Sequence, residues 1–131
     1  MNTINRNDLT SLDVQKLWVE FERSMDTTIS ETAECIFSAF IRYENALKNL
    51  NYLAGLIEDK ANRVKNETNN GLKSVVAGAY INHLGELQNN ALAFEAGCLQ
   101  LYNAKNEYNS LVTLFAKITG IEHVLDYKIS A

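Results

Sequence analysis

Histidine and cysteine are the side chains that most readily do chemistry, and this chain holds few of them. Its 131 residues include two of each: His83, His123, Cys35 and Cys98. Neither histidine belongs to a Glu-x-x-His pair, the spacing that builds carboxylate-bridged metal sites in helical bundles. No Cys-x-x-Cys or His-Glu-x-x-His zinc spacing occurs. The sequence therefore predicts no catalytic residue, no metal ligand and no bound cofactor.

The cysteines and the clustered carboxylates have simple structural interpretations. Cys35 and Cys98 each lie among apolar residues with helical spacing, and two cysteines are too few for a disulfide framework. We therefore expect both to be buried thiols, which pack like small hydrophobic side chains. The carboxylates Glu31, Glu34 and Glu44 are interpreted as one solvated helix face.

The charge and the apolar content of the chain indicate which kinds of partner to expect. The chain has 12 Lys and Arg against 16 Asp and Glu, a net charge of −4, which argues against nucleic-acid binding because phosphate contacts need surplus basic residues. No stretch approaches the roughly 18 apolar residues of a membrane span, and the polar N-terminus lacks the apolar segment of a secretion signal. We therefore expect a cytoplasmic protein that is not in a membrane.

The apolar pattern is helical throughout. The chain contains no Pro, which favours long uninterrupted helices. Between Ile29 and Val64 apolar residues recur at steps that alternate between four and three, a 3.5-residue repeat typical of coiled-coil packing. These positions are Ile29, Ala33, Ile36, Phe40, Tyr43, Leu47, Leu50, Ala54, Ile57, Ala61 and Val64.

The same rhythm recurs in the second half of the chain. It runs through Leu87, Ala91, Phe94, Cys98, Leu101, Tyr108, Val112 and Phe115. The turn-forming residues at 66–71 separate the two halves. The pattern predicts long helices at about 29–65 and 72–119, preceded by a short helix at about 10–25. The segment 121–129 after Gly120 is interpreted as a short helix or a helix continuation, and a strand is the less favoured alternative.

These elements predict an all-α fold within one domain spanning 1–131. We expect an elongated antiparallel helical hairpin or bundle of three helices, four if 121–129 is helical, with coiled-coil-like packing. A turn at 66–71 would place Phe40 against Cys98. It would also bring Gly55 near Gly85, where a close backbone approach would offset the cost of about 1 kcal/mol for each glycine inside a helix; the alternative is that these glycines are simply tolerated.

The predicted function follows from how far the short helix can reach. If it folds back, about 24 Å of helix covers the long helix only to about Asn45; the alternative is that it continues straight into the long helix. In either case apolar residues near the turn stay uncovered, and exposed apolar patches mark association sites. The predicted interface residues are Tyr52, Leu53, Leu56, Val75 and Ala79.

The predicted activity is therefore non-catalytic. We expect a helical protein–protein interaction module that acts as an adaptor, inhibitor, chaperone or immunity-type partner. The alternative is a self-assembling structural subunit of a larger complex, so the expected partner is another protein or a second copy. An enzyme with dispersed catalytic residues is the third choice.

Overall fold

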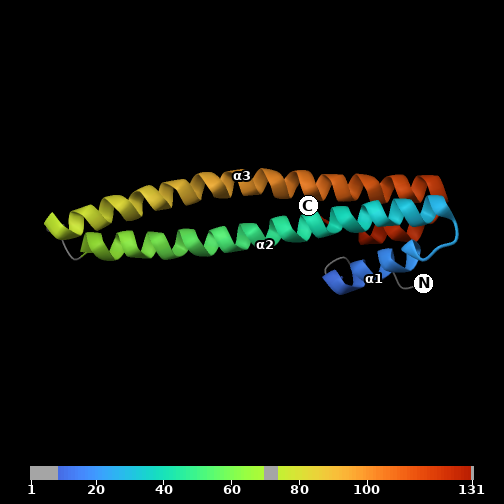
Figure 1. Cartoon of the computed structure of the whole chain (residues 1–131), viewed down its shortest axis with the longest axis horizontal. Coiled ribbons are helices and arrows are strands. Elements are labelled where there is room, and N and C mark those ends of the chain that lie inside the picture. The colour runs from blue at the N-terminus through green and yellow to red at the C-terminus, as the bar shows by residue number, and fades with distance from the viewer. Residues whose placement is uncertain (1–8, 70–73, 131) are drawn as a thin grey trace. The chain divides into compact units, whose positions relative to one another are not determined.

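The computed structural model describes residues 9–69 and 74–130, and it describes side chains in these ranges outside 67–80. The helices are α1 (Ser11–Glu22), α2 (Thr27–Asn69) and α3 (Ser74–Thr119), followed by a short 3₁₀ helix, η2 (Glu122–Tyr127) (Figure 1). No strand occurs in the described ranges. The all-α class and the three predicted helices are confirmed, with boundaries that differ by a few residues, and the segment 121–129 contains the 3₁₀ helix.

Side-chain caps explain where α1 and α2 begin. The Thr10 hydroxyl accepts a hydrogen bond from the Asp13 backbone N–H at 3.2 Å, and the Thr10 N–H donates to the Asp13 carboxylate at 3.1 Å. This reciprocal capping box lowers the pKa of Asp13. At α2, the Asp26 carboxylate accepts from the Thr28 N–H at 2.9 Å. Asp26 therefore starts the helix earlier than the predicted residue 29.

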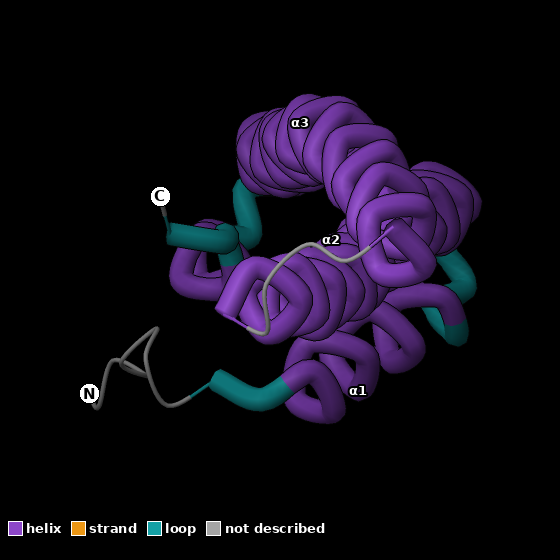
Figure 2. Tube along the Cα trace, turned by 90° about the vertical axis from the view of Figure 1, so that its left-hand side faces the viewer, coloured by secondary structure: helices purple, strands orange, loops and turns teal. Residues whose placement is uncertain are grey.

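The chain divides into two compact units, which are described separately. The three-helix unit comprises Met1–Asn45 and Tyr102–Ala131, and the two-helix unit comprises Ala46–Leu101. In the three-helix unit α1 lies beside α2 (Figures 1 and 2). The Ser11 hydroxyl at the start of α1 donates a hydrogen bond to the Glu44 carboxylate. The short helix therefore folds back and reaches the neighbourhood of Asn45, as the first of the two alternatives predicts.

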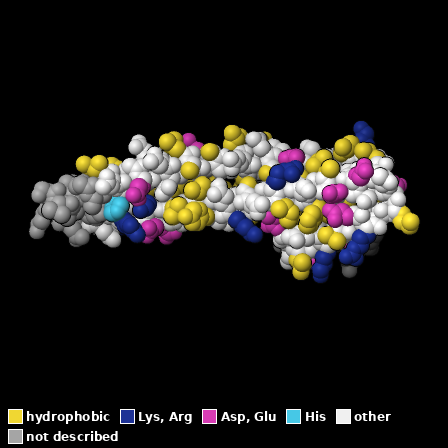
Figure 3. All heavy atoms as spheres, in the orientation of Figure 1, with side chains coloured by type: hydrophobic (Ala, Val, Ile, Leu, Met, Phe, Trp, Pro, Cys, Tyr) yellow, Lys and Arg dark blue, Asp and Glu magenta, His cyan; other side chains and the backbone are white. Residues whose placement is uncertain are grey.

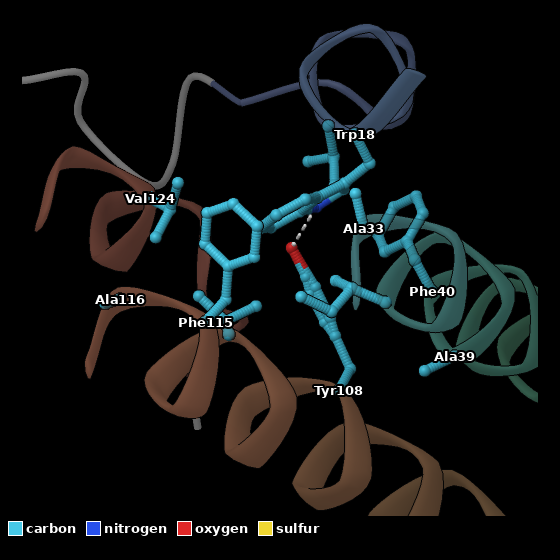
Figure 4. Packing of buried hydrophobic residues seen from close by; sticks show 11 residues of the cluster. Trp18, Ala33, Ala39, Phe40, Tyr108, Phe115, Ala116 and Val124 are labelled. Carbon is cyan, nitrogen blue, oxygen red and sulfur yellow. Dashed lines mark hydrogen bonds between the residues drawn. The ribbon is translucent and has the colours of Figure 1, made fainter. Parts of the chain in front are cut away.

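The buried hydrophobic core lies in the three-helix unit (Figure 4). The Trp18 ring packs edge-on against Phe115, with ring centroids 5.3 Å apart. Its indole N–H donates to the Tyr108 hydroxyl at 3.1 Å, and that hydroxyl donates to the Tyr127 carbonyl at 2.7 Å. The buried hydrophobic residues of the described part of the chain are Val14, Trp18, Ala33, Ile36, Ala39, Phe40, Tyr108, Val112, Phe115, Ala116 and Val124.

The C-terminal segment is hydrogen-bonded to α3 in the same unit. The Asn109 side chain donates to the Ile129 carbonyl at 2.8 Å and accepts from the Ile129 N–H at 2.7 Å. Gly120 ends α3 with a φ of +75°, a backbone conformation in which glycine meets no steric penalty. Val124 in η2 can therefore turn back and join the core.

The two-helix unit is built from a half-buried seam. On α2 the half-buried residues include Leu50, Leu53, Ile57, Lys60 and Val64. On α3 they include His83, Leu87, Asn90, Phe94 and Leu101, with Gly97 fully buried. Both rows alternate steps of three and four, the repeat expected for two helices packed along their length.

The structure corrects the predicted facing of the helices. Phe40 packs against Tyr108, with ring centroids 5.4 Å apart, and not against Cys98. Cys35 and Cys98 are both exposed, so the prediction of two buried thiols is wrong. The inward row of α3 contains Gly97, one position before Cys98. The sequence pattern predicted Cys98 as the inward residue because cysteine is more hydrophobic than the neighbouring Gly97.

The predicted close approach of two glycines is also wrong. A Cβ atom built on Gly55 or Gly85 would meet nothing within 4 Å. A Cβ on Gly97 would lie 3.1 Å from the Leu50 Cδ1 atom. Of the glycines that the structure describes in the two-helix unit, Gly97 is therefore the one at which α2 and α3 approach closely.

Candidate interaction surface

The predicted interface residues have different environments. Tyr52 on α2 is 65% exposed, whereas Leu53 and Leu56 are half-buried. Val75 and Ala79 belong to α3, but their side chains lie outside the described residues. Binding through these five residues remains a prediction.

Leu53 takes part in the packing between the two helices. Its Cδ1 atom lies 3.7 Å from the position of a Cβ built on Gly97. A side chain in this position supports the α2–α3 seam, because it fills the space that the missing glycine side chain leaves. A charge at Leu53 would therefore disturb the two-helix unit itself.

The outer face of α3 carries several exposed apolar side chains in this unit. Ile81, Leu92 and Leu99 are separated by about three and two whole turns of a helix, so they project from one side. Their exposures are 66%, 62% and 61%, and Leu84 beside them is 44% exposed. The opposite side of the same helix carries Leu87, Phe94 and Leu101, which are half-buried. In the two-helix unit, α3 is apolar on two sides, although α2 covers one.

Charge is scarce along this part of α3. Between Ile81 and Leu101 the sequence contains two carboxylates, Glu86 and Glu95, and no Lys or Arg. Glu86 forms an ion pair with Lys60 of α2, and this hydrogen-bonded ammonium group lowers the pKa of Glu86 from its ordinary value. Figure 3 shows hydrophobic side chains spaced along α3 with few charged ones between them. A helix that is apolar on two sides is ordinarily packed on both.

Two hollows in the three-helix unit have a more polar character. One, of about 230 Å³, lies between the start of α1, α2 and the C-terminal segment; burial, followed by the nearby Glu44 carboxylate, raises the pKa of the Tyr43 phenol that lines it. The other, of about 690 Å³, is an open groove between α2 and α3 that contains Cys35 and the ion pair of Arg42 with Glu107 at 2.6 Å.

Within the ranges that the structure describes, no cluster of three His, Cys, Asp or Glu side chains could hold a metal ion. His123 is exposed and lies near the Phe21 ring, at 6.2 Å between centroids, and His83 is half-buried in the two-helix unit. Nor does any helix in these ranges combine the length and the apolar character needed to cross a bilayer. The absence of enzymatic activity remains a prediction.

Comparisons with protein-family models, with curated proteins and with solved structures found no match.

The exposed apolar residues on the outer face of α3 could have been found in the sequence, but the predicted stripe of buried residues did not include most of them. The stripe followed Leu87, Phe94 and Leu101, which do face inward. It assigned no role to Ile81, Leu92 or Leu99. A search for a second apolar row on the same helix would have found these residues.

Proposed function

We propose that this protein is a non-catalytic protein-binding module and that the outer face of α3 in the two-helix unit is its binding surface. The observation that supports the proposal is the row of exposed apolar side chains at Ile81, Leu84, Leu92 and Leu99. Scattered apolar residues are common on protein surfaces, but exposed apolar side chains that recur along one side of a helix with little charge between them favour an association site. Such a module would act as an adaptor, an inhibitor, a chaperone or an immunity-type partner.

The structure favours Leu92 and Leu99 over Leu53 and Leu56 as the residues to change. Both lie on the exposed side of α3, so glutamate at these positions stays in water and the helices keep their packing. A matched control is Ala93→Glu with Gln100→Glu, because each position follows a stripe residue and lies about 100° around the helix. Ala93 and Gln100 are also exposed. The two variants therefore carry the same added charge at the same spacing.

The experiment compares three immobilised proteins: the parent chain, Leu92→Glu/Leu99→Glu and the control pair. Each is incubated with extract from the source cells and with untagged parent chain, and retained proteins are identified and then rebuilt from purified components. We expect a purified partner to bind the parent and the control but not the Leu92/Leu99 variant. Equal binding by all three with unchanged helical circular dichroism, or binding by none, would contradict the proposal.

A further inference from the structure

We infer that α1 and the C-terminal segment 121–130 form one cover over the core of the three-helix unit, and that they open and close together while α2 and α3 stay packed. Trp18 and Phe21 of α1 lie against Phe115 of α3, with ring centroids 5.3 and 5.0 Å apart. Val124 of η2 joins the same buried cluster. Both segments therefore conceal one apolar surface, which becomes accessible when the cover opens.

The two segments of the cover meet at one buried hydroxyl group. The Tyr108 hydroxyl accepts from the indole N–H of Trp18 in α1 (Figure 4) and donates to the Tyr127 carbonyl in the C-terminal segment. Phe21 of α1 also lies beside His123, at 6.2 Å between ring centroids. Removal of either segment breaks one of the two bonds at Tyr108, and an unpaired buried polar group is unfavourable. Each segment therefore stabilises the docked position of the other.

Each segment is too short to hold its shape alone. α1 has 12 residues, and isolated helices shorter than about 12–15 residues are marginally stable in water. η2 has 6 residues, and a 3₁₀ helix has poorer hydrogen-bond geometry than an α-helix. We therefore expect each segment to lose its helical structure when it leaves the core, which makes opening cooperative.

The junctions allow the cover to leave without unwinding α2 or α3. The Asp26 carboxylate accepts from the Thr28 N–H at 2.9 Å, so α2 is capped from its own junction. At the end of α3 the Gly120 N–H donates to the Ala116 carbonyl at 2.9 Å. Between α1 and α2 the Met25 side chain is fully exposed. Both junctions can therefore bend while the long helices keep their ends.

α2 and α3 also contact each other directly in the three-helix unit. The Phe40 and Tyr108 rings pack at 5.4 Å between centroids, and Arg42 forms an ion pair with Glu107 at 2.6 Å. Neither contact involves a residue of the cover. Proteins open locally in cooperative units that leave the rest of the structure folded, and these contacts identify α2 and α3 as the part that stays folded.

The test is amide hydrogen exchange of the full chain, followed residue by residue by nuclear magnetic resonance, in variants directed at one segment each. Thr10→Ala removes the side-chain cap of α1, and Asn109→Ala removes both hydrogen bonds to the Ile129 backbone. Each variant should speed exchange about three- to tenfold at the Trp18 amide of α1. The Lys128 amide of the C-terminal segment should change by the same factor.

Two exposed positions provide the controls. Leu12→Ala on α1 and Asn106→Ala on α3 change side chains that are exposed. Both exchange rates should stay within about twofold of the parent in these variants.

The outcomes distinguish one cover from two separate segments. In the parent, the Trp18 and Lys128 amides should give one opening constant, larger than at the Phe40 and Val112 amides of α2 and α3. Faster exchange only in the segment at which a substitution is directed would overturn the inference, because the segments would then move independently. Equal opening constants at all four amides would also overturn it, because the cover would then open only when the whole unit unfolds.

Discussion

The three-helix unit and the two-helix unit contain parts of the same two long helices, yet they bury their side chains differently. Among the residues whose side chains the structure describes, every buried hydrophobic one lies in the three-helix unit. In the two-helix unit the seam residues are half-buried, and the fully buried residue described there is Gly97. A two-helix layer can cover one side of each helix, and complete burial requires a further element. In the three-helix unit α1 and the C-terminal segment supply it.

The largest expected effect tests whether α1 accounts for this difference. Trp18→Ala should lower the free energy of unfolding by about 3–5 kcal/mol, because it removes a fully buried aromatic side chain and leaves a cavity. Tyr52→Ala in the two-helix unit removes an exposed ring and should change stability by less than about 0.5 kcal/mol. Urea unfolding followed by far-ultraviolet circular dichroism measures both. Equal midpoints for the two variants would mean that the three-helix core contributes no more than the open surface.

The next effect concerns the hydrogen bonds inside the three-helix core. Tyr108→Phe leaves the Trp18 indole N–H without its acceptor and the Tyr127 carbonyl without its donor, which should cost about 1–3 kcal/mol. Tyr102→Phe changes an exposed tyrosine on the same helix and serves as the control. The same urea experiment compares them, and similar stabilities would show that solvent reaches the Tyr108 hydroxyl.

The pH dependence of the parent supplies a second measurement on Tyr108. Burial raises the pKa of this phenol above its ordinary 10.0, so the neutral form is favoured in the folded state. Its contribution is complete below pH 10 and is lost as the pH rises toward the folded pKa. The Tyr108→Phe variant should therefore lose stability less steeply than the parent above pH 10.

A smaller effect on stability is expected when two glycines of the two-helix unit, Gly55 and Gly97, are each replaced by alanine. Gly55→Ala adds a methyl group in open space and should stabilise the protein by about 1 kcal/mol through helix propensity. Gly97→Ala has the same propensity gain, but its methyl group meets Leu50 Cδ1 at 3.1 Å, so the net gain should be smaller. Thermal and urea unfolding of the two variants give the order. A gain at Gly97 equal to that at Gly55 would show that α2 and α3 are not in close contact there.

Gly97 also shows which part of the structure the sequence did not predict, namely the register between α2 and α3. The helices and the core residues Ala33, Ile36, Phe40 and Phe115 follow from periodicity, because one apolar face per helix must be buried. The register between helices does not, since hydrophobicity ranks Cys98 above its neighbour Gly97, whereas close packing selects the residue with no side chain. The acceptor at Tyr127 is a backbone carbonyl, which no residue type encodes.

The sequence predicted that apolar side chains stay exposed on the part of the hairpin beyond the short helix, but it did not identify which residues these are. The reach of the short helix correctly limited its cover to the region before about Asn45, which left the remaining part of the hairpin as the expected binding region. The named residues were drawn mainly from the α2 side, where Leu53 contributes to the seam. The exposed row on α3 depends on which side of that helix faces α2, and a change of one position in phase alters that assignment.

The smallest expected effect concerns the ion pair of the two-helix unit and tests whether its surface charges hold the seam together. Lys60 lowers the pKa of Glu86 below the ordinary 4.5, so the pair stabilises the folded state above that pH and the contribution disappears as the pH falls through the lowered pKa. Glu86→Gln should therefore be slightly less stable than the parent at pH 7 and equally stable once Glu86 is protonated. Glu58→Gln, an exposed carboxylate on α2, is the control. Nuclear magnetic resonance titration of Glu86 in the parent and in Lys60→Met gives the direct measurement, and the pKa should rise when the ammonium group is removed. An unchanged pKa would mean that the pair does not form in solution, and the half-buried apolar seam alone would then hold α2 and α3 together in this unit.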